Sequence, residues 1–203
     1  MIRNIIFDLG NVLISWKPEE YLKLNGYDDN VRKLILEQIV RSPEWLLLDN
    51  GDIDLNEAAR RIAERSSLKI PRILDVFNLR TKILFPLTKN TRLLPELKKA
   101  GFRLYYLSNF PMDIFEEIKT GYYFFRHFDG GIISAEAKFS KPDRRIYEIL
   151  LEKYSLIPEE SLFIDDLDIN VKSAESIGMK GLVTFGSLEI SKKIEEVLSL
   201  SSA

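Results

Sequence analysis

Acidic, amide and hydroxyl side chains directly follow several short apolar runs of this sequence. These residues are Asp8, Ser108, Asn109, Asp165 and Asp166, with Lys141 and Asn170 close to helix starts further along the chain. Two adjacent acids at the end of a buried strand repel each other and lose hydration unless a cation lies between them. The pair Asp165-Asp166 therefore indicates a site for a hard divalent cation.

Each of these fragments also has an ordinary structural explanation. An Asp or a Ser-Asn pair after a strand is commonly a turn former or a helix N-cap, and the Lys of Lys141-Pro142 is commonly a solvated residue at a helix start. In an open parallel sheet, however, ligands bind at the carboxyl ends of the strands, where the strand order reverses. Four such fragments occur in order along the chain, each after a predicted strand, and they would meet at one edge of one sheet. This favours a functional site over four unrelated turns. The fragments are Asp8, Ser108-Asn109, Lys141-Pro142 and Asp165-Asp166.

Five short apolar runs predict the strands that would position these side chains. They cover residues 4–7, 104–107, 131–134, 162–164 and 182–185. Apolar residues on both faces of a run are typical of parallel strands covered by helices on both sides. Helical patterns alternate with the later runs, at 93–100, 143–154, 169–177 and 188–200, and Gly101 is placed to end the first of them. The chain is therefore predicted to be an α/β protein with a Rossmann-like, mostly parallel sheet.

The region from about Trp16 to Asn90 has a different pattern. Helix follows helix there, at 18–24, 29–40, 56–66 and 70–83, and no strand-like run interrupts them. We therefore expect an inserted α-helical cap domain formed by residues 16–90 and an α/β core formed by residues 1–15 and 91–203. Residues 15–17 and 88–91 are the predicted hinges between the two.

The composition excludes several classes of chemistry. The 203 residues include no Cys and a single His, at position 127, which rules out disulfides, a thiol nucleophile and zinc sites built from Cys or several His. Catalysis would have to use carboxylates, Lys, hydroxyls, amides and a hard cation. A formal net charge of −2, from 29 basic and 31 acidic residues, gives little electrostatic reason to expect a nucleic-acid partner.

The sequence shows neither a signal-peptide pattern nor an uncharged apolar stretch of the roughly 18–20 residues that span a bilayer. It therefore predicts a cytoplasmic protein with no membrane partner, and it leaves the oligomeric state open. A Gly-rich loop of the Walker type is also absent from the sequence, which argues against the use of nucleoside triphosphates.

Four segments resemble, in order, the four motifs of the haloacid dehalogenase-like (HAD) hydrolase superfamily. They are residues 5–13 around Asp8, the pair Ser108-Asn109, the triplet Lys141-Pro142-Asp143, and Asp165-Asp166 together with Asn170. Segments 16–18, 42–45 and 48–53 are similar to the branch with a helical cap between the first and second motifs. Within that branch the chain most resembles bacterial sugar-1-phosphate phosphatases.

The resemblance implies that the protein hydrolyses a small phosphorylated metabolite through an aspartyl-phosphate. Asp8 would then be the nucleophile, and a carboxylate is able to attack phosphorus and form an acyl phosphate. Lys141 would be the second catalytic residue, pairing with Asp8 and with the phosphoryl oxygens as charge spreads in the transition state. Ser108, Asn109 and Lys141 would bind the substrate phosphoryl group, Ser108 through its hydroxyl and Asn109 through its backbone amide.

The same resemblance implies a Mg²⁺ cofactor with oxygen ligands. Asp8 and Asp166 would each contribute a carboxylate oxygen, and Gly10 would contribute its backbone carbonyl. Asp165 would bind the metal through water or orient the other ligands, with Asn170 supporting it by a hydrogen bond.

One position departs from the family pattern. Phosphatases of this superfamily usually carry a second Asp two residues after the nucleophile, which acts as general acid and then as base, and Gly10 stands there in this sequence. A positioned acid or base contributes roughly 10²–10⁴-fold in rate. The protein could be a slow phosphatase or could bind phosphate without catalysis. It could also act on a substrate whose leaving group needs little protonation, such as an anomeric, acyl or aryl phosphate. We favour this last interpretation, with a sugar 1-phosphate as the example.

Two other functions of the same fold stay open at this point. A non-catalytic phosphate-binding protein is one of them. A metal-free 2-haloacid dehalogenase also uses an Asp nucleophile, but on carbon. The pair Asp165-Asp166 argues against it, because two acids facing the nucleophile without a metal would raise its pKa and repel a carboxylate substrate.

Substrate selection is expected to depend on the cap. The cap residues most suited to contact a substrate are Trp16, Tyr21, Trp45 and Asp49. For the aromatic residues, packing inside the helical bundle is the more common role. Asp49 and Asp52 flank Gly51, a pattern that an ordinary turn between two helices also explains.

Overall fold

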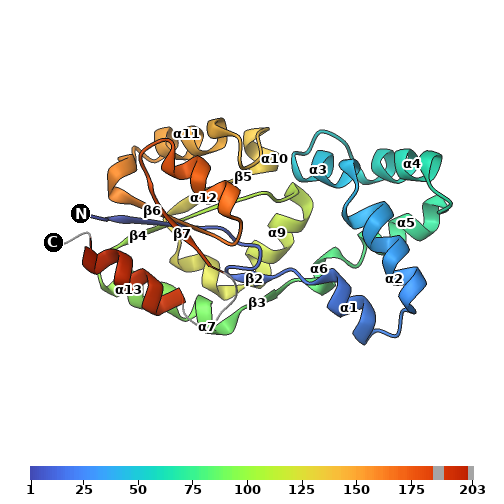
Figure 1. Cartoon of the computed structure of the whole chain (residues 1–203), viewed down its shortest axis with the longest axis horizontal. Coiled ribbons are helices and arrows are strands. Elements are labelled where there is room, and N and C mark those ends of the chain that lie inside the picture. Colours follow the sequence, from blue (N-terminus) through green and yellow to red (C-terminus); the bar gives the residue numbers. More distant parts are fainter. Residues whose placement is uncertain (185–189, 201–203) are drawn as a thin grey trace.

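A five-stranded parallel sheet forms the centre of the larger part of the protein. The computed structural model describes residues 1–184 and 190–200, and Figure 1 shows the sheet with helices on both sides. The strand order is β5-β4-β1-β6-β7, and every neighbouring pair is parallel. The strands are β1 (Asn4–Phe7), β4 (Arg103–Ser108), β5 (Gly130–Ile133), β6 (Ser161–Asp165) and β7 (Lys180–Val183).

Successive side chains of the central strands enter two different hydrophobic clusters. In β1, Ile5 and Phe7 belong to one cluster and Ile6 to the other. In β6, Phe163 joins the cluster of Ile6. This alternation is the consequence of the two-residue period of a strand, and it explains why the runs are apolar at every position.

Helices cover both faces of the sheet, and the two hydrophobic clusters identify which helices these are. One cluster includes residues of α8 (Leu93–Lys99), α9 (Met112–Gly121), the 3-10 helix η2 (Tyr123–His127) and α13 (Ile190–Leu200). The other includes residues of α11 (Arg144–Lys153) and α12 (Asp168–Glu175). The three layers confirm the predicted α/β, Rossmann-like fold.

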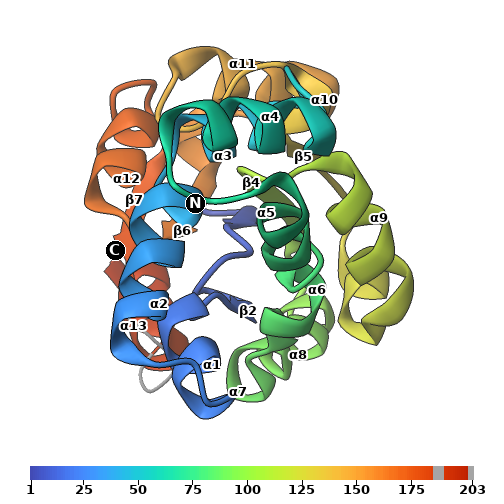
Figure 2. The same ribbon diagram turned by 90° about the vertical axis from the view of Figure 1, so that its right-hand side faces the viewer.

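A group of helices at the other end of the molecule has a hydrophobic core of its own (Figures 1 and 2). Ile39, Ile62 and Phe77, from three of its helices, are fully or almost fully buried in that core. The helices are α1 (Pro18–Leu24), α2 (Asp29–Ile35), the π-helix η1 (Leu36–Val40), α3 (Pro43–Asp49), α4 (Leu55–Arg65), α5 (Ile70–Phe77) and α6 (Arg80–Ile83). We call this group the cap; its boundaries at 16 and 90 stay a prediction.

The two segments that connect the sheet to the cap pair with each other. β2 (Ile14–Ser15) and β3 (Phe85–Pro86) form a two-stranded antiparallel sheet. The expectation that no strand occurs between residues 16 and 90 was therefore wrong. A strand of two residues, one of them Pro, is too short to show an alternating pattern.

Several element boundaries also differ from the sequence-based expectation. The predicted helix 70–83 is two helices, because α5 ends at its C-cap Asn78 and α6 begins after Leu79. The last strand lies two residues earlier than predicted; Phe185 and residues 188–189 of the predicted final helix are outside the described residues. Short elements that the sequence analysis did not predict are α3, α7 (Thr88–Thr91), α9, η2, α10 (Ser134–Ala137) and η3 (Pro158–Glu160).

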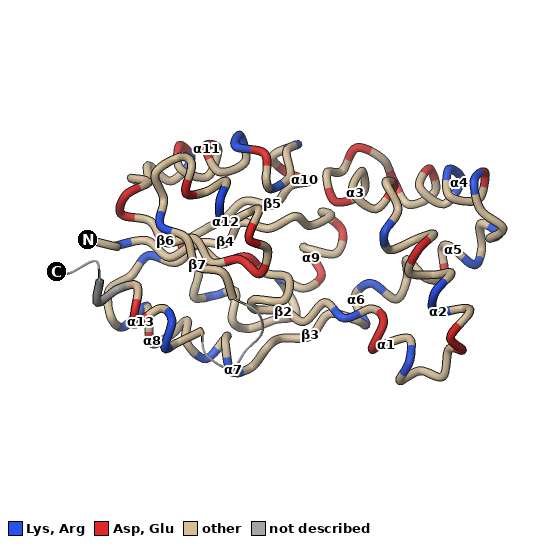
Figure 3. Tube along the Cα trace, in the orientation of Figure 1, with Lys and Arg blue, Asp and Glu red and all other residues tan. Residues whose placement is uncertain are grey.

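Charged residues of both signs are interspersed along the core and the cap (Figure 3). A stretch of acidic residues lies at the end of the sheet that faces the cap (Figure 3). Within residues 1–184 and 190–200, no helix is long and apolar enough to cross a membrane.

Candidate active site

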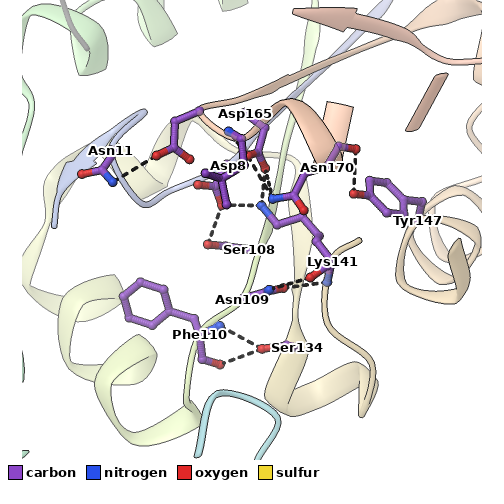
Figure 4. Close-up of polar contacts among 12 residues, drawn as sticks. Asp8, Asn11, Ser108, Asn109, Phe110, Ser134, Lys141, Tyr147, Asp165 and Asn170 are labelled. Carbon is purple, nitrogen blue, oxygen red and sulfur yellow. Dashed lines mark hydrogen bonds and ion pairs between the residues drawn. The ribbon is translucent and has the colours of Figure 1, made fainter. Parts of the chain in front are cut away.

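Asp8 lies immediately after β1 at the centre of a buried polar cluster. Its backbone N–H donates to the carbonyl of Ile164 in β6 at 2.8 Å, so the residue still follows the sheet direction. Its Oδ1 accepts hydrogen bonds from Ser108 Oγ at 2.8 Å and from Lys141 Nζ at 2.6 Å (Figure 4). The carboxyl ends of β1 and β4 therefore bring together the candidate nucleophile and a hydroxyl, and the segment before α11 (Arg144–Lys153) adds an ammonium group.

Lys141 is held by both its side chain and its backbone. Nζ donates to Asp8 Oδ1 and to Asp165 Oδ2, each at 2.6 Å, and the side chain is 2% exposed. Two hydrogen bonds join the Asn109 side chain to the Lys141 backbone: Lys141 N–H donates to Oδ1 at 2.8 Å, and Nδ2 donates to the Lys141 carbonyl at 3.0 Å. The Asn109 side chain therefore positions Lys141, and the expected contact of the Asn109 backbone amide with substrate oxygens stays a prediction.

The charges of this cluster depend on one another. Burial raises the pKa of Asp8 to about 6, although the positive charge of Lys141 opposes the rise. Burial alone would lower the pKa of Lys141, but the nearby charges of Asp8 and Asp165 outweigh that effect and raise it. Lys141 is therefore a permanent positive charge at the point where a phosphoryl group would add negative charge.

Asp165 is fully buried, and both of its oxygens accept hydrogen bonds. Oδ1 accepts from the backbone N–H of Leu167 at 2.8 Å and from Asn170 Nδ2 at 3.0 Å, while Oδ2 accepts from Lys141. The Tyr147 hydroxyl donates to the Asn170 carbonyl at 2.9 Å (Figure 4). Asp165 therefore holds Lys141 in place and Asn170 supports Asp165, while the expected role of Asp165 toward a metal stays a prediction.

Asp166 points toward a residue that the sequence analysis did not single out. Its Oδ2 accepts a hydrogen bond from Asn11 Nδ2 at 3.0 Å, and Asn11 Oδ1 accepts one from the Trp16 N–H at 3.1 Å. Asn11 has a positive φ of 54°, a conformation that Asn tolerates better than most residues. The pair Gly10-Asn11 after a strand was the available signal for such a turn.

The arrangement of the acids fits a divalent cation. Asp8, Asp165 and Asp166 each offer a carboxylate oxygen, and these oxygens all lie within 4.8 Å of one another. Asp8 Oδ2 accepts no hydrogen bond from any residue within the described ranges. Burial is the main cause that raises the pKa of Asp166, although the hydrogen bond from Asn11 and the charge of Lys141 oppose the rise. A set of carboxylate oxygens with one uncompensated member suits Mg²⁺.

A cavity of about 310 Å³ lies over this cluster, between the core and the cap. Asp8, Gly10, Ser108, Lys141 and Asp166 line it from the core. Trp45, Asp49 and Arg80 line it from the cap, whereas Tyr21 does not line it. Its apolar lining residues include Trp16, Trp45, Leu84, Phe110, Ile114 and Leu167.

Two aromatic contacts and one ion pair organise the cap side of the cavity. The Trp16 and Trp45 ring centroids lie 5.5 Å apart, and the Trp45 and Phe77 centroids lie 5.9 Å apart. Arg80, which is 5% exposed, donates to Asp113 of α9 at 2.7 Å. Trp45 therefore packs against the cap cluster and Trp16 against the core cluster, and both line the cavity. Arg80 was missed, because a lone Arg in a helical pattern carries no spacing signal.

Known proteins resemble this chain along almost its entire length. The sequence profile of the haloacid dehalogenase-like hydrolase family matches residues 2–178. Sesquiterpene phosphatase astK from Aspergillus oryzae is 30% identical over 193 residues, which cover 95% of this chain and 95% of that protein. Glyceraldehyde 3-phosphate phosphatase from Methanothermobacter thermautotrophicus is 30% identical over 200 residues, covering 93% of this chain and 88% of that protein.

A solved structure shares the whole architecture. It is a HAD family enzyme from Bacteroides thetaiotaomicron in complex with magnesium and inorganic phosphate. The two chains are 24% identical with a TM-score of 0.72, and the match covers 95% of this chain and 98% of the other. At this identity the likeness concerns the arrangement of sheet, helices and cap.

Proposed function

The chain belongs to the haloacid dehalogenase-like hydrolase family, and we propose that it is a magnesium-dependent phosphatase that acts through a phosphorylated Asp8. The observation that carries this proposal is the geometry of the Asp8 carboxylate. One of its oxygens is held by Ser108 and Lys141, and the other receives no hydrogen bond from the described residues. A carboxylate that Ser108 and Lys141 hold in place can use one oxygen to attack phosphorus and the other to bind a metal.

The residues of the core have different roles in phosphoryl transfer. Asp8 attacks phosphorus and forms an acyl phosphate, which water then hydrolyses. Lys141 and the Ser108 hydroxyl stabilise negative charge on the phosphoryl oxygens, and Asp165 keeps Lys141 in place. Bound Mg²⁺, held by Asp8, Asp166 and the Gly10 carbonyl, would neutralise the charge that otherwise keeps a phosphate dianion away from a carboxylate.

The acid pair favours this chemistry over metal-free dehalogenation. Without a cation, Asp165 and Asp166 would add two negative charges beside the nucleophile and repel a haloacid carboxylate. The presence of two phosphatases among the similar proteins points the same way. A protein that only binds phosphate remains the main competitor, and the experiment below distinguishes it.

For the substrate, we propose a phosphomonoester of an apolar alcohol. The walls of the cavity beyond the phosphoryl site are mainly aromatic and aliphatic, which suits an apolar leaving group better than a polyol. Similarity to a sesquiterpene phosphatase supports this choice. The competing proposal is a sugar 1-phosphate, which rests on the absence of an acid at Gly10.

Hydrolysis of p-nitrophenyl phosphate with and without Mg²⁺ tests the proposed reaction. We expect activity that EDTA abolishes and that Asp8→Asn lowers by about 10⁴-fold or more. Asp75→Asn, at an exposed position on α5 away from the cavity, is the control. An inactive but phosphate-binding wild-type protein would favour the non-catalytic alternative, and activity that survives Asp8→Asn would contradict the proposal.

A comparison of three substrates tests the leaving group. Hexyl phosphate is expected to have a higher kcat/KM than either glucose 1-phosphate or glucose 6-phosphate. A preference for glucose 1-phosphate over both other compounds would favour the sugar-1-phosphate proposal instead.

A further inference from the structure

One carboxyl group in the cavity has no role in the chemistry above. Asp49 is the last residue of α3, and it lines the same cavity as Asp8 and Gly10. In the part of the chain that the structure describes, no group donates a hydrogen bond to its carboxyl oxygens and no basic group lies within ion-pair distance. A half-buried carboxyl group that lines the cavity and has no partner among the described residues is free to contact a ligand there.

The backbone around Asp49 is fixed to the core close to Lys141. The hydroxyl of Ser134, in α10, donates to the Asp49 carbonyl, and Lys138 Nζ donates to the Gly51 carbonyl at 2.9 Å. α3 and α10 accordingly lie next to each other in Figures 1 and 2. Gly51 has a φ of +65°, which lets the chain turn away directly after this contact. These bonds hold Asp49 at the cap side of the cavity.

We propose that Asp49 is the general acid and base of this phosphatase, protonating the leaving-group oxygen in place of the acid that is absent at Gly10. This inference rests on the proposed function and names a residue for a step that the core residues leave without one. It also removes the reason to require an easily departing sugar 1-phosphate. An alkyl alcohol, which leaves poorly as an alkoxide, then becomes a reasonable substrate.

The other titratable groups that line the cavity already have other roles or cannot transfer a proton. Lys141 is bonded to two carboxylates, and Asp8 is the nucleophile. Asp166 belongs to the metal site, and the Arg80 guanidinium remains protonated in proteins. Asp49 is the remaining group along the described cavity wall that can give and take a proton.

The surroundings of Asp49 favour its protonated form. Burial raises its pKa to about 8, although the charge of Arg80 opposes the rise. The charged groups near it are Arg80 from α6, which is already paired with Asp113, and Lys138 from the core, which is bonded to backbone carbonyls. A carboxyl group that is protonated at neutral pH can donate its proton in the first step.

The two steps balance as follows. As Asp8 bonds to phosphorus, the bond from phosphorus to the leaving oxygen breaks, and the Asp49 proton moves to that oxygen to give the free alcohol. The resulting Asp49 carboxylate takes a proton from water as the water oxygen attacks phosphorus. The bond between phosphorus and Asp8 then breaks, which releases phosphate, regenerates the Asp8 carboxylate and leaves Asp49 protonated again.

The Asp49→Asn variant of the intact protein, assayed with Mg²⁺ on two phosphomonoesters, tests the proposal. With hexyl phosphate, whose leaving group needs a proton, kcat should fall by about 10²–10⁴-fold. With p-nitrophenyl phosphate, whose leaving group departs as a stable anion, the first-turnover burst of p-nitrophenolate should be nearly unchanged. The wild-type rate on hexyl phosphate should decline above about pH 8, and the variant should lack this decline.

Asp52→Asn is the matched control, because this exposed acid lies three residues away and does not line the cavity. It should behave as the wild type with both substrates. The double variant Asp49→Asn, Gly10→Asp provides a rescue test. Among the described residues, the nearest neighbour of a Cβ at Gly10 would be Asp8 Oδ2 at 3.6 Å, which is an ordinary contact. The position therefore has room for the Cβ of an Asp, which should restore part of the hexyl phosphate activity.

The outcomes separate this inference from the proposed function. A loss in the rate of the p-nitrophenolate burst as large as the loss of kcat on hexyl phosphate, or no loss on hexyl phosphate, would overturn the role of Asp49 while leaving the phosphatase in place. If the wild-type protein hydrolyses neither compound, the proposed function fails and the role of Asp49 fails with it. Selective loss together with rescue by Gly10→Asp would support both.

Discussion

The two sides of the cavity are built in different ways. On the core side, Asp8, Lys141, Asp165 and Asn170 are joined by short hydrogen bonds and ion pairs, and all are buried. On the cap side, aromatic rings dominate, and Asp49 has no hydrogen-bond partner for its carboxyl group among the described residues. The core side can therefore be rigid and specific for a phosphoryl group, while the cap side contacts the part of the substrate that varies.

This difference implies that changes on the two sides should have different kinetic signatures. A change on the core side should lower turnover with every substrate, because the phosphoryl group is common to all of them. A change on the cap side should alter the ranking of substrates, because it acts on the leaving group. The predictions below use this distinction, beginning with the largest expected effect.

Removal of the Lys141 charge should have the largest effect. Lys141→Met is expected to lower kcat by about 10²–10³-fold with p-nitrophenyl phosphate and hexyl phosphate alike, since it removes stabilisation of charge on the phosphoryl oxygens. Circular dichroism should show that the variant folds. A loss confined to one substrate would contradict the assignment of Lys141 to the common chemistry.

Loss of the Asn11 side chain should weaken metal binding. Asn11→Gly keeps the positive φ accessible but removes the hydrogen bond to Asp166. The Mg²⁺ concentration that gives half-maximal activity should rise by about 10–100-fold, with kcat recovered at high Mg²⁺. If the Mg²⁺ dependence were unchanged, Asp166 would not be a ligand oriented by Asn11.

A change at Trp45 tests the cap side, where the effect should depend on the substrate. Trp45→Ala is expected to raise KM for hexyl phosphate by about tenfold, because the ring borders the cavity and packs on Trp16. KM for methyl phosphate, which lacks the apolar chain, should change much less. An equal rise for both compounds would mean that Trp45 acts through the stability of the cap instead.

The smallest expected effect concerns the pH dependence of stability. The pKa of Asp49 is raised from 3.8 to about 8, so between these values the folded state binds more protons than the unfolded state. Stability should therefore fall as pH rises across this window, by at most about 1.4 kcal/mol per pH unit from this group. Asp49→Asn should remove that contribution and so flatten the decline of Tm by at most a few degrees per pH unit. Parallel Tm curves for the two proteins would show that Asp49 is solvated.

The core side could be predicted from the sequence because most of its residues lie at the ends of strands. Asp8, Ser108 and Asp165 each follow a buried apolar run, and the parallel sheet brings the ends of such runs to one edge. The cluster of Asp8, Lys141 and Asp165 is present in the structure as the strand pattern predicted. Their catalytic roles stay predictions until they are tested.

The cap side could be predicted less well because tertiary packing decides which face of a helix meets the cavity. Trp16, Trp45 and Asp49 were among the candidates, yet so was Tyr21, which does not line the cavity. Arg80 was missed because it lies in what the sequence suggested was one continuous helix. The bonds from Ser134 and Lys138 to the end of α3 join residues more than 80 positions apart, which local patterns cannot reveal.

Detection of a phosphoryl group on Asp8 tests the central claim most directly. Wild-type protein mixed with Mg²⁺ and p-nitrophenyl phosphate should be quenched in acid during the first turnover, digested and analysed by mass spectrometry. We expect the peptide that contains Asp8 to gain one phosphoryl group, and Asp8→Asn to show no such gain. Substrate turnover without any phosphorylated Asp8 peptide would contradict the account.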